Sequence, residues 1–332
     1  MPNHHSTFSI ASTRQKTSVT SGAIAGIKHR LPHILALQEL SPDQAYEFAQ
    51  LEGYEPMFLS STPSEVEAGA IAGRDDIHEW RGKNVGTALT GFIFRPDVLT
   101  LLRCGRFWLN ENPDALPAYT DRGETDKGFG NMNTYRAVLY ACLKHVQSGR
   151  EVYVFNSHYP LKLTPDGSQM RFKCAEAEAN KIREIIGGEP RDCVGDKLCV
   201  SMGDRNPIPQ GVMLPVDASH VEDAASMKPL SDAMHDVRKV HQYGPATTFP
   251  GFTYDRAQNP FNEDLTDFVS SEALDMMFAN QLPERSGNVV TEFCPESGCI
   301  TFNPTRFNPG RYLASDHAMQ EADFVMADAT DA

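Results

Sequence analysis

The sequence predicts a layered α/β fold, and three features of the 332-residue chain indicate it. Short segments rich in apolar and β-branched residues recur along the whole chain, as the strands of sizeable sheets do. Two segments between them repeat apolar residues at three- and four-residue spacing, which is typical of surface helices. The hydrophobic content of 40% is enough for a large core. Because no internal repeat, linker or composition shift marks a boundary, we predict one domain over residues 1–332.

Nine apolar segments are the predicted strands. Each is four to ten residues long and is bounded by polar or turn-forming residues. In chain order they are "FSIAS" (8–12), "ILALQ" (34–38), "TALTGFIF" (87–94), "RAVLYACLKH" (136–145), "EVYVFNSH" (151–158), "LCVSM" (198–202), "ALDMMFA" (273–279), "NVVTEF" (288–293) and "ADFVMA" (322–327).

Two helices are predicted between these strands. Residues 41–53 begin with Ser41 as N-cap, Pro42 at the first position and Gln44 to complete a capping box, and Gly53 ends the helix. Residues 168–188 form a longer helix with a charged outer face. Its predicted apolar face consists of Phe172, Ala175, Ala179, Ile182 and Ile186. Two long polar stretches, roughly residues 60–85 and 110–134, are predicted loops.

Charge, hydropathy and cysteine content narrow the class of protein. The formal net charge of −14 disfavours non-specific binding to nucleic acid. No segment has the 18 or so apolar residues that span a bilayer, and the first residues lack the apolar centre of a secretory signal, so we expect a cytoplasmic protein. Export without a cleavable signal stays open. Seven scattered cysteines favour reduced thiols, although Cys294 and Cys299 are close enough for a metal clip or a local disulfide.

Polar residues follow several of the predicted strands directly. In "SMGDRNPIP" (201–209), Gly, Asp, Asn and Pro are ordinary turn residues. If the chain instead stays extended to Asn206, then Asp204 and Asn206 share one face and Arg205 points to the other. The same pattern of an acid, amide or histidine at a strand end recurs at Glu39, Asn156, His158, Asp275, Asp316 and His317.

The order and the residues of these motifs resemble those of the endonuclease/exonuclease/phosphatase superfamily of metal-dependent phosphoesterases. Its members carry "QE", "NTH", "GDFN", "LDxxF" and "SDH" in this order. The matching residues here are Gln38-Glu39, "NSH" (156–158), "GDRN" (203–206), "LDMMF" (274–278) and "SDH" (315–317). The segment "FWLNENP" (107–113) is similar to the "FWLSETP" of a bacterial branch, in which an arginine that matches Arg136 precedes the next strand.

The resemblance implies a four-layer α/β sandwich, with two mixed β-sheets face to face, helices on the outside and the active site at one end of the sheets. It implies Glu39 as the principal Mg²⁺ ligand, with Mn²⁺ as an alternative ion, and Asp316 as a second metal or water contact. Magnesium suits carboxylate ligands because it prefers oxygen donors and is completed by water and substrate phosphate.

The resemblance also implies a division of roles in attack by water on phosphorus. Asp204 would orient and deprotonate the water, and Asn206 would steady the water or a phosphoryl oxygen. His317, held by Asp275, would donate a charge-assisted bond to the phosphate. The residues implied at the phosphate or leaving-group side are His158, Asn156 and Arg136.

The chain departs from the family at three positions. The first strand offers Thr13 or Arg14 where the family has an asparagine, Pro160 replaces an acid of many relatives, and Arg205 replaces an apolar or aromatic residue. One cluster looks rich in metal ligands but matches no motif, and we predict that it is solvated surface. Its residues are Asp75, Asp76, His78 and Glu79. His235 and His241 lie six apart in a helical pattern and do not share a face.

We therefore predict a Mg²⁺-dependent phosphoesterase. The favoured substrate is a phosphodiester or phosphomonoester on a small molecule, nucleotide or lipid headgroup, and no protein partner is predicted. A nuclease on DNA or RNA is the alternative enzyme, less favoured because the chain is acidic. A catalytically weakened phosphate-binding protein is the third hypothesis, which the altered first strand motivates.

Overall fold

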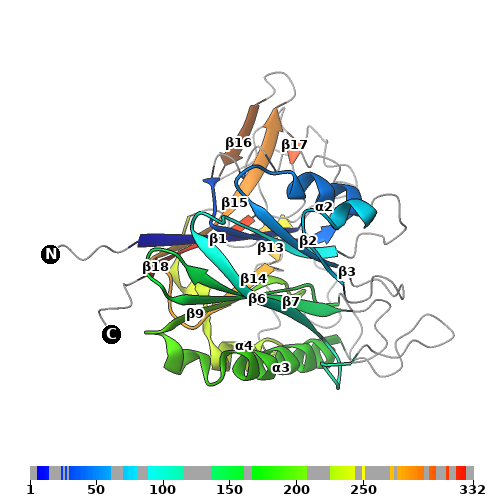
Figure 1. Ribbon diagram of the computed structural model, residues 1–332. Coiled ribbons are helices and arrows are strands. Elements are labelled where there is room, and N and C mark those ends of the chain that lie inside the picture. The colour runs from blue at the N-terminus through cyan, green and yellow to red at the C-terminus, as the bar shows by residue number, and fades with distance from the viewer. Residues whose placement is uncertain are drawn as a thin grey trace.

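The computed structural model describes residues 6–14, 24, 27, 30–60, 70–80, 89–115, 136–160, 167–207, 225–243, 249–250, 270–272, 275–294, 299–303, 312–313 and 319–326. These residues form four layers, which are a helix, two facing sheets and a second helical layer (Figure 1). The predicted four-layer α/β sandwich is confirmed.

The first sheet is mixed. In the described chain its strands run in the order β11-β15-β18-β1-β2-β5-β3-β4, and β16 and β17 pair with β15. Strand β1 is parallel to β2 and antiparallel to β18. The bounds are β1 Ser6–Arg14, β2 Ile34–Leu40, β3 Glu55–Ser60, β4 Ile71–Ala72, β5 Leu89–Phe94, β11 His241–Tyr243, β15 Arg285–Cys294, β16 Cys299–Asn303, β17 Tyr312–Leu313 and β18 Met319–Met326.

The second sheet has the order β10-β14-β9-β8-β7-β6 in the described residues. Strands β8 and β9 are parallel, and their neighbours are antiparallel to them. The bounds are β6 Leu99–Trp108, β7 Ala137–His145, β8 Glu151–Ser157, β9 Lys197–Asp204, β10 His235–Asp236 and β14 Asp275–Ala279. A separate small pair joins β12 (Phe249–Pro250) to β13 (Ser270–Glu272).

Helices cover the outer faces of the two sheets. Helix α2 (Pro42–Ala49) lies on the first sheet, and α3 (Gly167–Ile186) and α4 (Lys228–Ala233) lie on the second (Figure 1). The short 3₁₀ helices are η1 (Ile77–Trp80), η2 (Pro190–Cys193) and η3 (Val237–Val240).

Both predicted helices are present, with two corrections. Ser41 and Gln44 form the predicted capping box, but α2 ends at Ala49, about one turn before Gly53. In α3 the predicted apolar residues do face the sheet, except that Phe172 is only half-buried. The helix also buries two charged residues, Arg171 and Glu178, which the predicted apolar face did not include.

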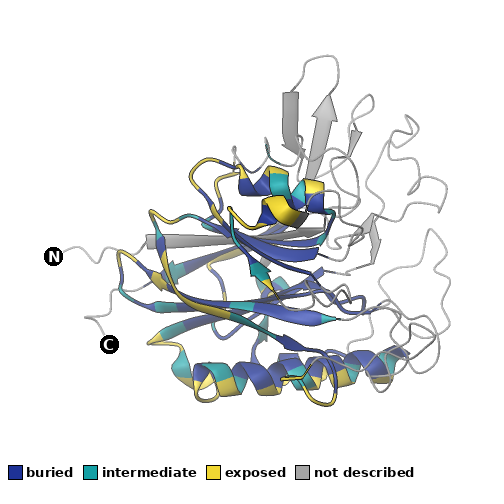
Figure 2. Ribbon diagram, turned by 45° about the vertical axis from the view of Figure 1, so that its right-hand side comes forward, coloured by how far each residue is buried: buried dark blue, intermediate teal, exposed yellow. Residues whose placement is uncertain are grey.

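Strand β2 shows how alternation builds the layers. Ile34 and Ala36 point into the apolar core between the sheets, whereas Leu35 and Leu37 pack in the core under α2. The central strands are accordingly buried on both faces, and exposed residues lie on the outer sides of the helices, on edge strand β6 and in loops (Figure 2). Two buried faces explain why these strands appear in the sequence as continuous apolar runs.

All nine predicted strands are present, and two further long strands were missed. Strand β6 is an edge strand with five consecutive exposed residues, Thr100 to Cys104, so it lacks the apolar run of a central strand. Strand β3 carries Pro56, which argues against a strand in a sequence pattern.

Several smaller predictions have outcomes in the fold. Asp75, Asp76, His78 and Glu79 are exposed, as expected. The helical pattern assumed for His235 and His241 is wrong, because the two residues lie in β10 and β11 of different sheets. The described free cysteines are Cys104, Cys142, Cys174, Cys193 and Cys199.

The backbones of Cys294 and Cys299 stand at opposite register positions of β15 and β16. No helix of the described chain is long and apolar enough to cross a membrane. The predicted loops fall largely outside the described residues.

Candidate active site

The predicted polar strand ends converge at one end of the second sheet. Because β8 and β9 are parallel, the residues after Asn156 and the carboxylate of Asp204 leave the sheet at the same edge. The antiparallel β14 begins there with Asp275, directly opposite Asp204. Arg136 precedes β7 at this edge, and its carbonyl accepts a hydrogen bond from the Leu109 N–H (2.8 Å).

Glu39 brings the first sheet to this site through an irregular backbone. In a regular strand Glu39 would share the face of Leu37 and point toward α2. Instead the pairing of β2 with β5 shifts register between Leu37 and Leu40, and Glu39 adopts a left-handed φ of 55°. A positive φ in a residue other than glycine is costly and is found most often at functional sites. Here it directs Glu39 toward His158 of the other sheet.

His158 lies between two carboxylates. Its Nε2 is 3.7 Å from Glu39 Oε1 and 3.5 Å from Asp204 Oδ2. Both distances are longer than the donor–acceptor distance of a normal N–H···O hydrogen bond. A bridging water could join such groups, or the distances could shorten when substrate binds. The side chain of Asp204 is fully buried, whereas that of Glu39 is 14% exposed, so solvent reaches this group from the Glu39 side.

Asp204 and Asn206 form a turn rather than an extended pair. Strand β9 ends at Asp204, and Asn206 has a left-handed φ of 47°, so the assumption that the chain stays extended is wrong. The Asn206 N–H donates to Asp204 Oδ1 (3.1 Å), and Asn206 Nδ2 donates to the Tyr159 carbonyl (2.9 Å). Asn206 therefore holds the Asp204 carboxylate in place from the turn.

Gly203 is required at the entry to this turn. Its φ is 141°, and a Cβ atom there would lie 1.8 Å from the carbonyl oxygen of Ser157. A glycine lets β9 approach the end of β8 this closely. The turn interpretation of "SMGDRNPIP" is thus confirmed, and the site interpretation stays a prediction.

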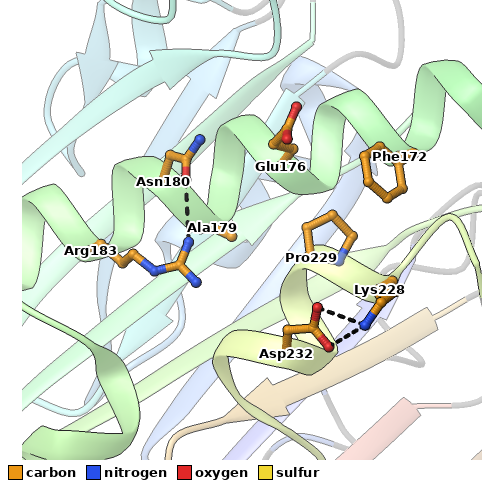
Figure 3. Close-up of a pocket in the computed structure, with 8 residues that line it drawn as sticks. All are labelled: Phe172, Glu176, Ala179, Asn180, Arg183, Lys228, Pro229 and Asp232. Atoms are coloured by element: carbon orange, nitrogen blue, oxygen red, sulfur yellow. Dashed lines mark hydrogen bonds and ion pairs between the residues drawn. The ribbon is translucent and has the colours of Figure 1, made fainter.

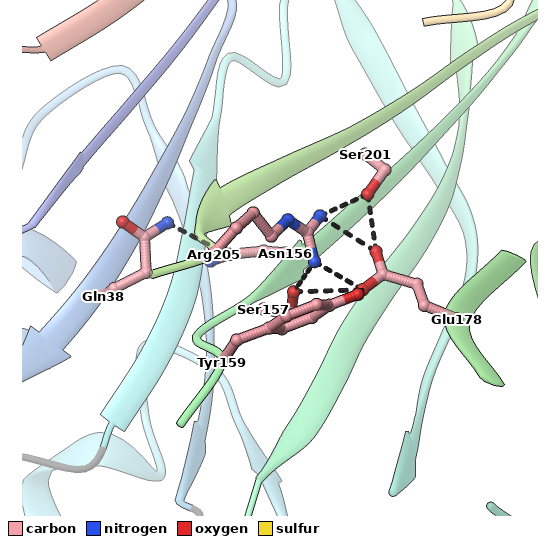
Figure 4. A network of polar contacts seen from close by, with 7 residues as sticks. All are labelled: Gln38, Asn156, Ser157, Tyr159, Glu178, Ser201 and Arg205. Atoms are coloured by element: carbon pink, nitrogen blue, oxygen red, sulfur yellow. Dashed lines mark hydrogen bonds and ion pairs between the residues drawn. The ribbon is translucent and has the colours of Figure 1, made fainter. Parts of the chain in front are cut away.

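Asn156 joins the two sheets in the buried interior. Its Nδ2 donates to the carbonyls of Leu37 (3.0 Å) and Gly91 (2.7 Å), and its Oδ1 accepts from Gln38 Nε2 (2.7 Å; Figure 4). Both side chains are fully buried. This geometry gives Asn156 a positioning role between the sheets, and its contact with substrate phosphate stays a prediction.

The remaining predicted residues are only partly described. Asp316 and His317 lie outside the described residues, although β18, which follows them, begins at the edge where β1 ends. The register places the backbone of Arg14 beside Gln38, the residue before Glu39. Asp275 is fully buried, and its pairing with His317 stays a prediction.

Sequence reasoning missed a polar network behind the strand ends. It joins Arg205 to Glu178 of α3 and includes Ser157, Tyr159 and Ser201 (Figure 4). Arg205 does point away from Asp204, as predicted, but into a buried ion pair. The signal that could have found this network is the charge of Glu178 on the apolar side of the α3 pattern.

Solved structures with the same architecture cover nearly the whole chain. The endonuclease/exonuclease/phosphatase from Bacteroides vulgatus has a TM-score of 0.61 at 19% identity, over 97% of this chain and 100% of that one. The mannosyl-6-phosphatase of Bacteroides thetaiotaomicron has a TM-score of 0.61 at 17% identity, over 96% and 99%. The chain has the endonuclease/exonuclease/phosphatase fold. TDP2 from D. rerio, solved with a single strand DNA product, shares this fold with a TM-score of 0.57 at 16% identity, over 96% and 98%.

A comparison with curated sequences finds one relative of this chain. The uncharacterized protein R895 of Acanthamoeba polyphaga mimivirus is 27% identical over 262 residues, which are 74% of this chain and 33% of that protein. The chain thus spans about a third of the length of the curated relative it matches. No protein-family model matches the chain.

The residues present at the strand ends fit a magnesium ion. The described residues contain no ready-made group of three or more His, Cys, Asp or Glu side chains around one ion position. Magnesium does not require such a group, because one or two carboxylates with water and substrate phosphate complete its octahedron. Glu39 supplies a partly exposed carboxylate beside the buried Asp204, and a cation there would offset their negative charge.

A cavity of about 250 Å³ on the outer helical layer is a separate feature. It lies between α3 and α4, and its lining includes Phe172, Arg183, Lys228 and Asp232 (Figure 3). Lys228 Nζ is 2.7 Å from Asp232 Oδ1, and Arg183 pairs with Glu189 and Asn180. The charged side chains of this cavity thus pair with one another or with neighbouring surface residues. We therefore place the candidate active site at the strand ends and not in this cavity.

Proposed function

We propose that the protein is a Mg²⁺-dependent phosphoesterase that directs water onto a phosphoester at the strand ends around Asp204. One observation carries the proposal: the carboxylates of Glu39, from one sheet, and Asp204, from the other, each lie within 3.7 Å of His158 Nε2. Glu39 reaches this place through a left-handed backbone conformation, and such conformations cluster at functional sites.

The side chains divide the chemistry among them. Asp204, fixed by the Asn206 N–H, accepts a proton from the attacking water. His158 donates to the phosphoryl or leaving-group oxygen, because its Nε2 lies at the strand ends, 3.5 Å from Asp204 Oδ2 and 3.7 Å from Glu39 Oε1. Glu39 binds the metal, together with Asp316. When bound, Mg²⁺ supplies Lewis-acid stabilisation of the charge that develops on the phosphoryl oxygens.

The favoured substrates are phosphodiesters or phosphomonoesters on small molecules, nucleotides or lipid headgroups. The net charge of −14 opposes binding to a long polyanion, since such binding depends on cationic contacts to phosphates. The mannosyl-6-phosphatase that shares the fold is a precedent for a small phosphomonoester.

The test is hydrolysis of bis-aryl and mono-aryl phosphates by the wild type and by Asp204→Asn. We expect Mg²⁺- or Mn²⁺-dependent turnover that EDTA abolishes, and a loss of about 10²–10⁴-fold in kcat for Asp204→Asn, because general-base catalysis contributes that much. The exposed Asp75→Asn is the matched control and should keep wild-type kcat. Wild-type turnover in Asp204→Asn would refute the assignment of the base.

Thermal shift gives a second readout that does not depend on turnover. Mg²⁺ at about ten times its Kd should stabilise the wild type by about 1.4 kcal/mol, and Glu39→Gln should lose this gain. Equal stabilisation of both proteins would place the metal elsewhere.

A nuclease is the second candidate function, because TDP2 with bound single strand DNA product has the same fold. Plasmid and oligoadenylate in the same assay distinguish it, since hydrolysis confined to oligonucleotides would overturn our preference. Phosphate binding without turnover of any substrate would favour the third hypothesis, a catalytically weakened phosphate-binding protein. The feature that motivates this hypothesis is Arg14 at the end of the first strand, whose backbone lies beside Gln38.

A further inference from the structure

Arg205 is a buried charge in the middle of the candidate active site. It stands between Asp204 and Asn206 in the chain, and its side chain is fully buried. The guanidinium is paired with Glu178 of α3, with Nη2 3.0 Å from Glu178 Oε1, and it also donates to the hydroxyls of Ser157 and Ser201 (Figure 4). A planar guanidinium is suited to hold several acceptors in one fixed arrangement.

Tyr159 ties the same ion pair to the backbone of both strand ends. Its hydroxyl donates to Glu178 Oε2 (2.8 Å), and the Arg205 guanidinium carbon lies 4.7 Å from its ring centroid. Burial raises the pKa of Tyr159 well above its usual value, so the hydroxyl keeps its proton as a donor. The Tyr159 N–H donates to the Asp204 carbonyl (2.8 Å), and its own carbonyl accepts from Asn206.

The network therefore includes the chain neighbours of His158 and Asp204. Ser157 and Tyr159 flank His158, and Arg205 separates Asp204 from Asn206. No member of the network needs to contact substrate for this effect. Charged groups buried this completely are expensive, and an apolar pair of similar volume often gives equal stability. A gain in stability is thus a poor explanation for the pair.

We propose that the buried Arg205–Glu178 pair is a positioning device that fixes the backbone of the two strand ends carrying His158 and Asp204. Arg205 and Glu178 are positioning residues, which act through the turn and not on the substrate. The kinetic consequence rests on the proposed function, whereas the effect on backbone mobility does not.

The test removes both charges in the double variant Arg205→Met/Glu178→Gln, which keeps side chains of similar length and an amide oxygen at position 178 as the acceptor for the Tyr159 hydroxyl. We expect its Tm to stay within about 3 °C of the wild type, since the charges contribute little net stability. Amide hydrogen exchange over residues 156–160 and 203–207 should become at least about tenfold faster, while exchange in α2 stays unchanged. With the aryl phosphate substrate, kcat should fall about 10²-fold and KM should stay within about threefold, as expected for misplaced catalytic groups.

The matched control is Arg183→Met/Glu189→Gln, which removes an exposed ion pair near the C-terminal end of the same helix. It should change neither local exchange nor kcat. If the Arg205 double variant fails to fold, Tyr159→Phe replaces it, because this change removes only the hydroxyl bond to Glu178. It should then raise local exchange and lower kcat by about tenfold.

Wild-type exchange at both strand ends in a folded variant would overturn the proposal, and so would unchanged kcat. If the wild type itself turns over no substrate, the proposed function fails, and the exchange measurement alone decides the positioning role.

Discussion

At the scale of single residues, the site depends on backbone conformations that few residues adopt. Three residues carry it: Glu39 and Asn206 have left-handed φ values, and Gly203 has a φ of 141°. Such conformations persist only where surrounding contacts hold them. The Asn206 bonds to Asp204 and Tyr159 are contacts of this kind.

Substitution of Gly203 by alanine should destabilise the protein severely. The new Cβ would meet the Ser157 carbonyl at 1.8 Å in a backbone conformation unfavourable for alanine, so we expect a loss of at least about 2–3 kcal/mol in the free energy of unfolding. Urea denaturation of purified protein measures this loss. Gly188→Ala is the control, because no atom lies within 4 Å of its Cβ position. Equal midpoints for the two variants would contradict the prediction.

At this scale the sequence identified most of the site and missed its support. The motif residues Glu39, His158 and Asp204 meet as the resemblance implied. A turn at this place was predicted, but the left-handed φ of Asn206 was not, because Asn206 is held by the Tyr159 carbonyl, 47 residues earlier in the chain. The burial of Arg205 was equally hidden, since its partner lies on a distant helix.

At the scale of elements, the position of a residue at a strand end can change its pKa. His33, which directly precedes β2, illustrates this at the opposite end from the site. Burial, followed by the nearby charges of Arg95 and His145, lowers the pKa of His33 to about 4. Its backbone carbonyl accepts a hydrogen bond from the Arg95 N–H (2.9 Å).

This shift predicts a pH dependence of stability. The unfolded chain binds a proton at His33 near pH 6.5, whereas the folded protein resists protonation until about pH 4. The stabilisation by neutral His33 is therefore complete above pH 6.5 and is lost as pH falls toward 4, by up to about 2–3 kcal/mol. Urea unfolding across this range should show a weaker pH dependence for His33→Gln than for the wild type. Identical slopes would show that another group is responsible.

Sequence patterns predicted elements well where both faces are buried and poorly elsewhere. Central strands such as β8 and β9 appear as continuous apolar runs. Edge strand β6 exposes much of one face and was not recognised. In α3 the apolar spacing located the helix correctly, but spacing alone does not reveal that Glu178 faces a buried arginine.

At the scale of the whole molecule, the site depends on the alignment of two sheets. The Asn156 amide spans the interior from β8 to the carbonyls of Leu37 in β2 and Gly91 in β5. Glu39 comes from one sheet and His158 from the other, so a shift of either sheet would separate them. That the two sheets face each other was predicted only through the family resemblance, and their strand order was not predicted, because it depends on pairing between distant segments.

Asn156→Leu should therefore reduce both stability and activity. The change leaves buried carbonyls and the Gln38 amide without their partner, which costs about 1–3 kcal/mol for each unsatisfied group. We expect a loss of at least about 2 kcal/mol in urea unfolding. Gln281→Leu removes a single bond to the Val325 carbonyl at a less buried position and should cost about 1 kcal/mol or less. A smaller effect at Asn156 than at Gln281 would contradict the proposed link between the sheets.

The parallel pairing of β8 with β9 has a consequence for how the protein folds. His158 and Asp204 lie side by side but are separated by 46 residues (204 − 158), and α3 occupies the connection. Parallel pairing across such a crossover requires a long loop to close before any contact compensates for the lost chain entropy. We therefore expect this end of the sheets, which carries the candidate site, to assemble late in refolding, after the hairpins and α3 have formed.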